Sequence, residues 1–411
     1  MMMAMAGSAV GLGNIWRFPY MVGEHGGAAF IIIYIICCLL VSLPVFFAEA
    51  TIGKATRKDT FGAMEAIAPD GRFKNVGYIA IVSSFIILSF YSVVGGWSFD
   101  YLLRSCAGGF SGKSVAEARE VFAGIGSSVL ETVGCMLVFL GLTAGIVAGG
   151  VEKGIGLFSK ISMPVLLVMM IVIASVSLTL PGSKEGVAYL VRPDFGKLNG
   201  AAIAAALGQS FFSLSLGVGT ILTYSSYMHE DEGIIAAGPW TAFFDTCFAL
   251  IAGFAIMPAV FAAGIEPSAG PSLVFETLPV IFSRMGVVLP VVFFLAILIA
   301  ALSSSISLLE VVVAWLVEQK HTTRPRAALL VFVFAAVLGT ACALVPKVFN
   351  TCDFISSNVL MMAGALIFSM IVGWIMPRET VLQHIRSRFI YGLIRYAAPV
   401  MIVAIAVTNL L

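Results

Sequence analysis

The sequence predicts an all-α membrane protein that crosses the bilayer many times. Hydrophobic residues make up 60% of the 411 residues and charged residues only 11%, and the mean hydropathy is +1.04, which excludes an ordinary soluble domain. The apolar residues fall into runs of about 20, the length that one spanning helix needs. A net charge of +1 argues against nucleic acid as a partner. The expected surroundings are therefore a lipid bilayer.

Eleven such runs fill the chain from end to end. We expect a single transmembrane domain over residues 1–411, with no soluble domain attached. The predicted spans are 1–22, 28–53, 75–105, 129–148, 156–180, 200–227, 238–263, 286–317, 326–345, 349–376 and 390–410.

The first span cannot be an uninterrupted helix. Gly7, Gly11 and Gly13 lie inside it, together with Asn14 and Arg17. A glycine in a helix interior costs about 1 kcal/mol, and an arginine near the middle of the membrane costs at least ~2.5 kcal/mol. Backbone groups without partners are tolerated at that depth only where they line a cavity or are buried in protein. The segment is therefore predicted to be a broken helix whose freed amides and carbonyls bind something polar.

A second interruption of the same kind lies in the sixth span. Residues 209–220 interrupt an apolar run with small polar residues and with Gly217 and Gly219. A lone pair of glycines is more simply a helix-packing motif. Two matched interruptions, five helices apart, instead predict a transport site at mid-membrane between two inverted repeats.

The charges of the loops predict the orientation. With a cytoplasmic N-terminus, the inside loops carry most of the basic residues, and those outside lie largely in the longer 106–128 and 181–199 loops, where the positive-inside rule is weak. Eleven spans then place the C-terminus outside, and we expect a multi-pass protein of the inner membrane. The inside basic residues are Lys54, Arg57, Lys58, Arg72, Lys74, Lys153, Lys160, Lys320, Arg324, Arg326, Arg378, Arg386 and Arg388.

Nothing in the sequence indicates catalysis. No nucleophile–base pair stands out, no His and Cys spacing suggests a zinc site, and there is no phosphate-binding loop of the ATPase type. The seven cysteines give no paired framework. We expect a protein that is not an enzyme and that has no cofactor.

Four stretches of this sequence resemble the neurotransmitter:sodium symporter family with its LeuT-like fold, in particular a bacterial branch with eleven helices. They are residues 7–19, 208–219, 270–279 and 301–307, in the order in which the family carries them. The resemblance implies two inverted five-helix repeats, here 1–180 and 200–376, with an extra helix at 390–410. It also implies that helices one and six are broken and that Na⁺ is the coupling ion.

The same resemblance implies two sodium sites built from oxygen ligands. Taken alone, the serines of the eighth span would more simply bond back to the preceding turn. One implied site combines the carbonyls of Gly7, Val10 and Ala300 with the hydroxyls of Ser303 and Ser304. The other combines the Ala9 carbonyl with the side chains of Asn14, Ser213 and Asp245.

The implied substrate is an α-amino acid. Its carboxylate would meet the amides of Leu12 and Gly13 at a half-helix N-terminus, where anions are favoured, and the Tyr91 hydroxyl. Its ammonium group would face carbonyls around Phe212 and Ser215. Gly11 replaces the aspartate of the monoamine branch and leaves room for the substrate's own carboxylate. The predicted substrate residues are Ala9, Gly11, Leu12, Gly13, Ile87, Tyr91, Phe212, Ser213, Ser215, Val218, Ser304 and Leu308, a lining that suits an apolar or aromatic side chain.

Charged residues on either side of this site are the predicted gates. Arg17 and Asp353 match the family's outer gate pair. We favour gating over a static ion pair between spans one and ten, because both residues flank the inferred site. Tyr227 and Glu310 are the principal candidates for a polar inner gate, and Glu49, Tyr224 and Glu318 are further candidates. Chloride-dependent members carry a neutral residue where this chain has Asp245, so the carboxylate predicts chloride-independent transport.

The resulting hypothesis is a sodium-coupled symporter that imports an α-amino acid by alternating access. Members commonly carry a basic and an aromatic residue before the first helix, which latch the inner gate, whereas here Met1 to Ala4 already lie in that helix. A non-transporting amino-acid sensor is therefore one alternative. A proton-coupled carrier of the same fold is another, and the sequence leaves the oligomeric state open.

Overall fold

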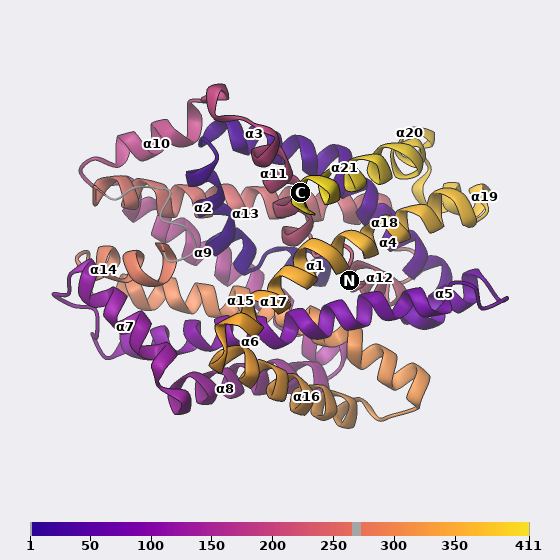
Figure 1. Ribbon diagram of the computed structural model, residues 1–411, viewed down its shortest axis with the longest axis horizontal. Coiled ribbons are helices and arrows are strands. Elements are labelled where there is room, and N and C mark those ends of the chain that lie inside the picture. Colours follow the sequence, from indigo (N-terminus) through magenta and orange to yellow (C-terminus); the bar gives the residue numbers. More distant parts are fainter. Residues whose placement is uncertain (1, 265–272, 411) are drawn as a thin grey trace.

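The computed structural model describes residues 2–264 and 273–410, and within these ranges the chain is built from helices without a β-strand. Nine helical stretches in the described part are long and apolar enough to cross a membrane, so the chain is a multi-pass membrane protein. They are Ala28–Thr56, Lys74–Cys106, Val129–Ala148, Val151–Leu178, Ile234–Ala262, Val288–Lys320, Arg324–Leu344, Pro346–Ile375 and Arg388–Val407. Many of the long helices follow the long axis of the molecule (Figure 1).

Two long helices form the centre of this bundle. Helix α6 (Gly77–Cys106) packs against α15 (Val288–Lys320), and both contact α8 (Val129–Ala148) and α16 (Arg324–Leu344). The most apolar part of α6 is 78% buried, whereas that of α8 is only 28% buried. Helices α8 and α16 therefore lie at the periphery, where their apolar side chains face lipid, and α6 and α15 carry the interior.

The first and sixth predicted spans are not among the nine because each is interrupted. The first is divided into α1 (Met2–Ala9), a π-helical turn (Gly13–Arg17) and α2 (Phe18–Glu24). The sixth is divided into α11 (Gly200–Ser213) and α12 (Thr220–Ser226). Both predicted breaks are thus present, while the total of eleven spans stays a prediction.

Several spans contain π-helical turns between their α-helical parts. The second span is α3 (Ala28–Cys37), then Cys38–Ser42, then α4 (Leu43–Thr56). The fifth begins with Val151–Gly156 and continues as α9 (Leu157–Leu178), and the seventh is α13 (Ile234–Ala262). The tenth consists of α17 (Pro346–Phe354), Ile355–Leu360, α18 (Met361–Met370) and Ile371–Ile375. The last comprises α20 (Arg388–Gly392), Leu393–Ala397 and α21 (Ala398–Leu410).

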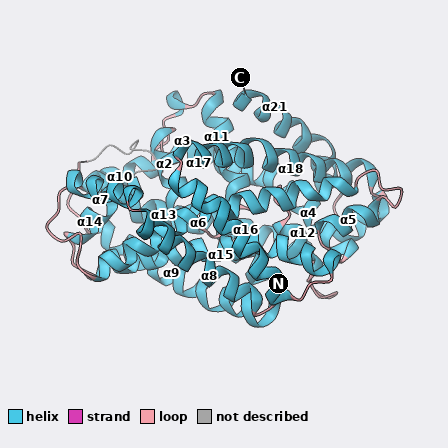
Figure 2. Cartoon of the chain, turned by 60° about the horizontal axis from the view of Figure 1, so that its bottom comes forward, coloured by secondary structure: helices cyan, strands magenta, loops and turns pink. Residues whose placement is uncertain are grey.

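Short helices lie at both ends of the bundle, where the sequence predicted only loops. At one end are α7 (Val115–Ser127), α10 (Ser183–Val191) and α14 (Leu278–Ser283), and at the other are α5 (Thr60–Ile67) and α19 (Arg378–Ile385). The segments 106–128 and 181–199 are therefore not simple loops. Helix α5, for example, begins where the Asp59 carboxylate accepts hydrogen bonds from the amides of Phe61 and Gly62, a standard N-cap. Figure 2 shows the helices of the described residues joined by short loops.

Candidate functional site

The break in the first span lies at residues 10–11, where the chain leaves helical geometry. The Gly11 amide donates to the Asn14 side-chain oxygen at 3.0 Å, so a side chain replaces the missing helical partner. The backbone at Gly11 approaches α15 closely, because an added Cβ would lie 2.0 Å from the Ser304 hydroxyl oxygen and would force that side chain to move. At Gly13 the Cβ would lie 3.0 Å from the Phe212 ring. The glycines thus let the broken backbone approach α15 and α11 closely.

The break in the sixth span is longer and has an unusual backbone. Ser215, Gly217 and Gly219 all adopt positive φ, at 53°, 79° and 76°. Such a conformation is uncommon for a residue other than glycine and marks Ser215 as a strained position. The Ser215 hydroxyl donates to the Ser8 carbonyl at 3.2 Å, which ties this break to the first one. The Gly217 amide donates to the buried Glu49 carboxylate at 2.6 Å.

A small cavity of about 30 Å³ lies between the two breaks. Every residue predicted to bind substrate lines it except Leu12, and Met361 of α18 completes the wall. This volume is far below the roughly 300–1,000 Å³ of typical ligand pockets, so we expect side chains to move when a substrate-sized molecule binds. The lining consists of Ala9, Gly11, Gly13, Ile87, Tyr91, Phe212, Ser213, Ser215, Val218, Ser304, Leu308 and Met361.

The Tyr91 hydroxyl is the notable polar group of this wall. It is buried beside the Leu12 backbone and the Ser304 side chain, and it forms no hydrogen bond of standard geometry with any described residue. Buried hydroxyls in native proteins are usually bonded, and Tyr91 comes from the central helix α6, which fixes its position. A polar group held without a partner in a cavity is suited to bind a polar ligand atom.

On one side of the cavity, three side chains converge on Asp245 of α13. Its carboxylate accepts hydrogen bonds from Asn14 at 2.7 Å, from Ser213 at 2.6 Å and from Tyr34 at 2.8 Å. All are buried, and within the described residues no basic side chain pairs with the carboxylate. Of the predicted oxygen ligands, Asn14, Ser213 and Asp245 are thus in contact, while Ala9 lines the adjoining cavity.

On another side, the eighth span meets the first. The Ser303 hydroxyl of α15 donates to the carbonyls of Gly7 and Val10, the latter at 3.1 Å. The Ser304 hydroxyl instead lines the cavity, and the Ala300 carbonyl lies 3.6 Å from the place of a Gly11 Cβ. Of the predicted Gly7–Val10–Ala300–Ser303–Ser304 oxygen ligands, those of Gly7, Val10 and Ser303 are therefore in contact beside the first break.

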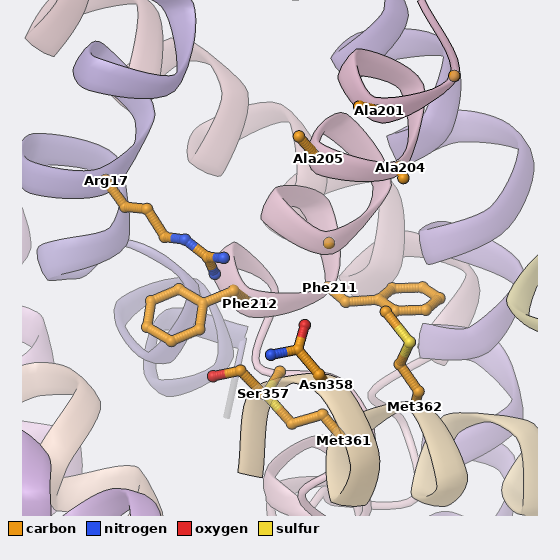
Figure 3. A pocket seen from close by; sticks show the side chains of 12 residues that line it. Arg17, Ala201, Ala204, Ala205, Phe211, Phe212, Ser357, Asn358, Met361 and Met362 are labelled. Carbon is orange, nitrogen blue, oxygen red and sulfur yellow. The ribbon is translucent and has the colours of Figure 1, made fainter. Parts of the chain in front are cut away.

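A larger cavity of about 340 Å³ adjoins the small one, separated from it by the shared residues Phe212 and Met361. The Arg17 guanidinium lies 4.8 Å from the centre of the Phe212 ring, a cation–π contact. Figure 3 shows Arg17 beside Phe212, with Ser357 and Asn358 facing them from another helix. No ion pair joins Arg17 to Asp353, although both lie in the described part; Asp353 accepts a hydrogen bond from Ser357 at 3.0 Å instead.

At the other end a buried polar cluster closes the bundle. The Glu310 carboxylate accepts a hydrogen bond from Tyr227 at 2.7 Å and forms an ion pair with Arg324. Arg324 also donates to the Val147 carbonyl at 2.9 Å. Tyr224 bonds to Ser307 at 3.1 Å beside this cluster, whereas Glu318 accepts from the Asp59 amide nearer the surface. Glu49 lies behind the sixth-span break and not in this cluster.

The comparison with known families agrees with this geometry. A model of the sodium:neurotransmitter symporter family matches residues 1–121 and 109–411. The chain belongs to this family. The family members are transporters, so this protein is a sodium-dependent symporter and not an enzyme.

Two bacterial relatives match this symporter in sequence over almost their whole length. An uncharacterised sodium-dependent transporter of Bacillus subtilis (strain 168) is 36% identical, covering 98% of this chain and 94% of that protein. An uncharacterised sodium-dependent transporter of Haemophilus influenzae is 32% identical, covering 99% of this chain and 96% of that protein. The crystal structure of MhsT in complex with L-phenylalanine superposes with a TM-score of 0.91 at 38% identity, covering 99% of this chain and 97% of that one. The symporter therefore has the LeuT-like fold.

Three residues of the site escaped the sequence analysis. Tyr34 bonds to Asp245, Met361 lines the small cavity, and Arg324 pairs with Glu310. The sequence contains a hint of the role of Arg324, because it is a basic residue at the start of one span and Glu310 is an acid inside the preceding span, about three turns before the end of α15. Tyr34 and Met361 lie in apolar runs, and nothing in the sequence around them indicates a role in the site. Residues 270–272 of the third family motif lie outside the described ranges, and Leu273–Thr277 form a π-helical turn before α14.

Proposed function

We propose that this symporter imports an α-amino acid with an apolar or aromatic side chain, driven by sodium, by alternating access and without chloride. We further propose eleven spans in two inverted repeats, 1–180 and 200–376, with the N-terminus in the cytoplasm, the C-terminus outside and the protein in the inner membrane. The two broken segments supply the first and sixth of these spans.

One observation carries the proposal: two groups of oxygen atoms adjoin the same break that borders the small cavity. The Asn14–Ser213–Asp245 group lies on one side and the Gly7–Val10–Ser303 group on another. Oxygen ligands suit hard cations, and each group takes a member from the first span. Ions bound there would hold the break in the form that binds substrate, which is the physical basis of coupling.

The class of substrate follows from what the cavity offers. The Tyr91 hydroxyl, which forms no standard hydrogen bond with a described residue, lies beside the Leu12 backbone, and together with the half-helix N-terminus at Gly13 it suits a carboxylate. The lack of space at Gly11 excludes an aspartate side chain there unless Ser304 moves. Ile87, Val218 and Leu308 suit an apolar side chain. The solved relative is bound to L-phenylalanine, which supports the same class.

Sodium alone provides enough driving force for this work. A tenfold concentration gradient is worth about 1.4 kcal/mol, and a potential of 100 mV adds about 2.3 kcal/mol per charge. Two ions would supply roughly 7 kcal/mol, enough for accumulation of a zwitterion on the order of 10⁵-fold.

Chloride independence is supported by the surroundings of Asp245. Its carboxylate is bonded only to neutral donors among the described residues, so its charge remains available to balance a cation in a site with a low dielectric constant. A bound chloride would otherwise have to supply that charge.

The arrangement of the gates supports alternating access. The Tyr227–Glu310–Arg324 cluster closes one side, while only Phe212 and Met361 separate the small cavity from the larger one at Arg17. A substrate entering from the Arg17 side has two side chains to displace. On the opposite side a buried ion pair must separate, so the two routes need not open together.

A thermal-shift screen tests the proposed substrate class. Purified protein is heated with each standard amino acid in sodium gluconate and in potassium gluconate. We expect apolar or aromatic amino acids to raise the unfolding temperature in sodium only, because a ligand that binds the folded state stabilises it. Equal shifts in potassium would exclude the sodium coupling, and shifts confined to charged amino acids would exclude the substrate class.

A further inference from the structure

A separate groove of about 510 Å³ lies between α8 and α9 and is lined mainly by apolar side chains. One wall is the glycine face of the fourth span. Gly145 and Gly149 line the groove, and a Cβ added at Gly145 would meet no atom within 4 Å. Leu157 and Ile161 of α9 form the opposite wall and are 52% and 58% exposed. Both walls belong to peripheral spans, so the groove opens toward the membrane.

Two polar groups distinguish this groove from an ordinary lipid-facing surface. Lys153 lines it at one end and forms no ion pair with any described residue. Ser162 lines it further along and is only 6% exposed, and its hydroxyl has no hydrogen-bond partner among the described residues. The neighbouring Glu152 lines a different cavity, together with Tyr227, so its charge does not face the groove.

We propose that this groove binds one anionic phospholipid. An acyl chain lies along the glycine face and the phosphate contacts Lys153. Lipid is the solvent at this depth and fills any apolar groove open to it, and a basic side chain at the mouth selects an anionic headgroup. The Ser162 hydroxyl offers a donor to an ester carbonyl within the groove. Lys153 is one of the basic residues on the predicted inner side, where anionic lipids gather.

The position of the groove couples a bound lipid to the inner gate. The π-helical turn Val151–Gly156 separates the groove from the cavity that Tyr227 lines, because its residues contribute to both. A lipid seated on Lys153 therefore contacts the wall of the inner pathway. The proposed lipid site rests on the orientation that is part of the proposed function, and it is independent of the substrate.

Native mass spectrometry of the purified full-length chain tests the proposal, with phosphatidylglycerol and phosphatidylcholine added separately. We expect tighter binding of one phosphatidylglycerol. Lys153→Gln should weaken it about fivefold, the effect of one basic residue near a membrane surface. Gly145→Leu should abolish it by filling the groove, and the open space at Gly145 lets the variant fold.

Matched variants provide the controls. Lys160→Gln removes an exposed lysine of α9 that does not line the groove, and Gly134→Leu fills open space elsewhere on α8. Both should bind the lipid like the parent chain. Unchanged lipid binding in Gly145→Leu, or equal affinity for the two lipids, overturns the proposal. A Gly145→Leu variant that turns a dimer into a monomer while lipid binding persists would assign the groove to a second copy instead.

Discussion

Asn14 and Asp245 lie 231 residues apart and form a direct contact: the Asn14 amide donates to the Asp245 carboxylate at 2.7 Å and to its backbone carbonyl at 3.0 Å. The Asn14 oxygen meanwhile accepts from the Gly11 amide at 3.0 Å. One side chain thus joins the freed backbone of the first span to the buried acid of the seventh. Any ligand that engages Asn14 or Asp245 must also affect the break next to the small cavity.

Asn14→Ala should therefore lower the affinity for sodium and for the amino acid together, each by about tenfold to hundredfold. The coupling free energy between two sites acts equally in both directions. Isothermal titration of each ligand at fixed concentrations of the other measures it. Asn358→Ala, which removes an asparagine from the larger cavity only, is the control and should change sodium affinity little. Amino-acid affinity that is unchanged in Asn14→Ala at zero and at saturating sodium would show that the two sites are not shared.

Asp245→Asn should make transport slow in gluconate and should let added chloride restore part of the rate. The variant keeps the size of the side chain but removes the charge that balances a cation. Uptake rates of both proteins in chloride and in gluconate measure the effect. If uptake by the parent chain stops without chloride, Asp245 does not supply that charge.

Gly11→Ala should weaken amino-acid binding by about fivefold or more. The new methyl group would lie 2.0 Å from the Ser304 oxygen, and overpacking of a close contact commonly costs about 1–3 kcal/mol. Gly134→Ala, where the same methyl group meets no atom within 4 Å, should bind like the parent chain. Equal affinities of the two variants would mean that the backbone at Gly11 does not border the substrate.

Arg324→Gln should destabilise the protein by about 3 kcal/mol, because it leaves the Glu310 carboxylate buried without its cation. Glu310→Gln in the same chain should recover more than half of the loss, since the double variant leaves no buried charge. Unfolding temperatures of the two single variants and the double variant measure the coupling. Strictly additive losses would show that the ion pair does not hold the bundle closed.

Hydropathy predicted much of this fold because the spans are long and uniform. The predicted span 129–148 coincides with Val129–Ala148, and the glycines located both breaks. Helices α7 and α10 were not predicted, because they are short and their charged and small residues interrupt the apolar pattern. Of the site, the residues in family motifs were predictable from the resemblance. Tyr34 and Met361 were not, since their roles depend on partners distant in sequence.

Uptake of radiolabelled L-phenylalanine into proteoliposomes tests whether this protein imports an amino acid by sodium coupling. The inside holds potassium gluconate, and the outside holds either sodium gluconate or potassium gluconate adjusted to the same pH. We expect concentrative uptake only with the inward sodium gradient, and we expect that uptake to be lost when a sodium ionophore dissipates the gradient. Sodium-dependent binding without any uptake would assign the chain to a sensor. Uptake driven by an inward proton gradient in sodium-free buffer would contradict sodium coupling itself.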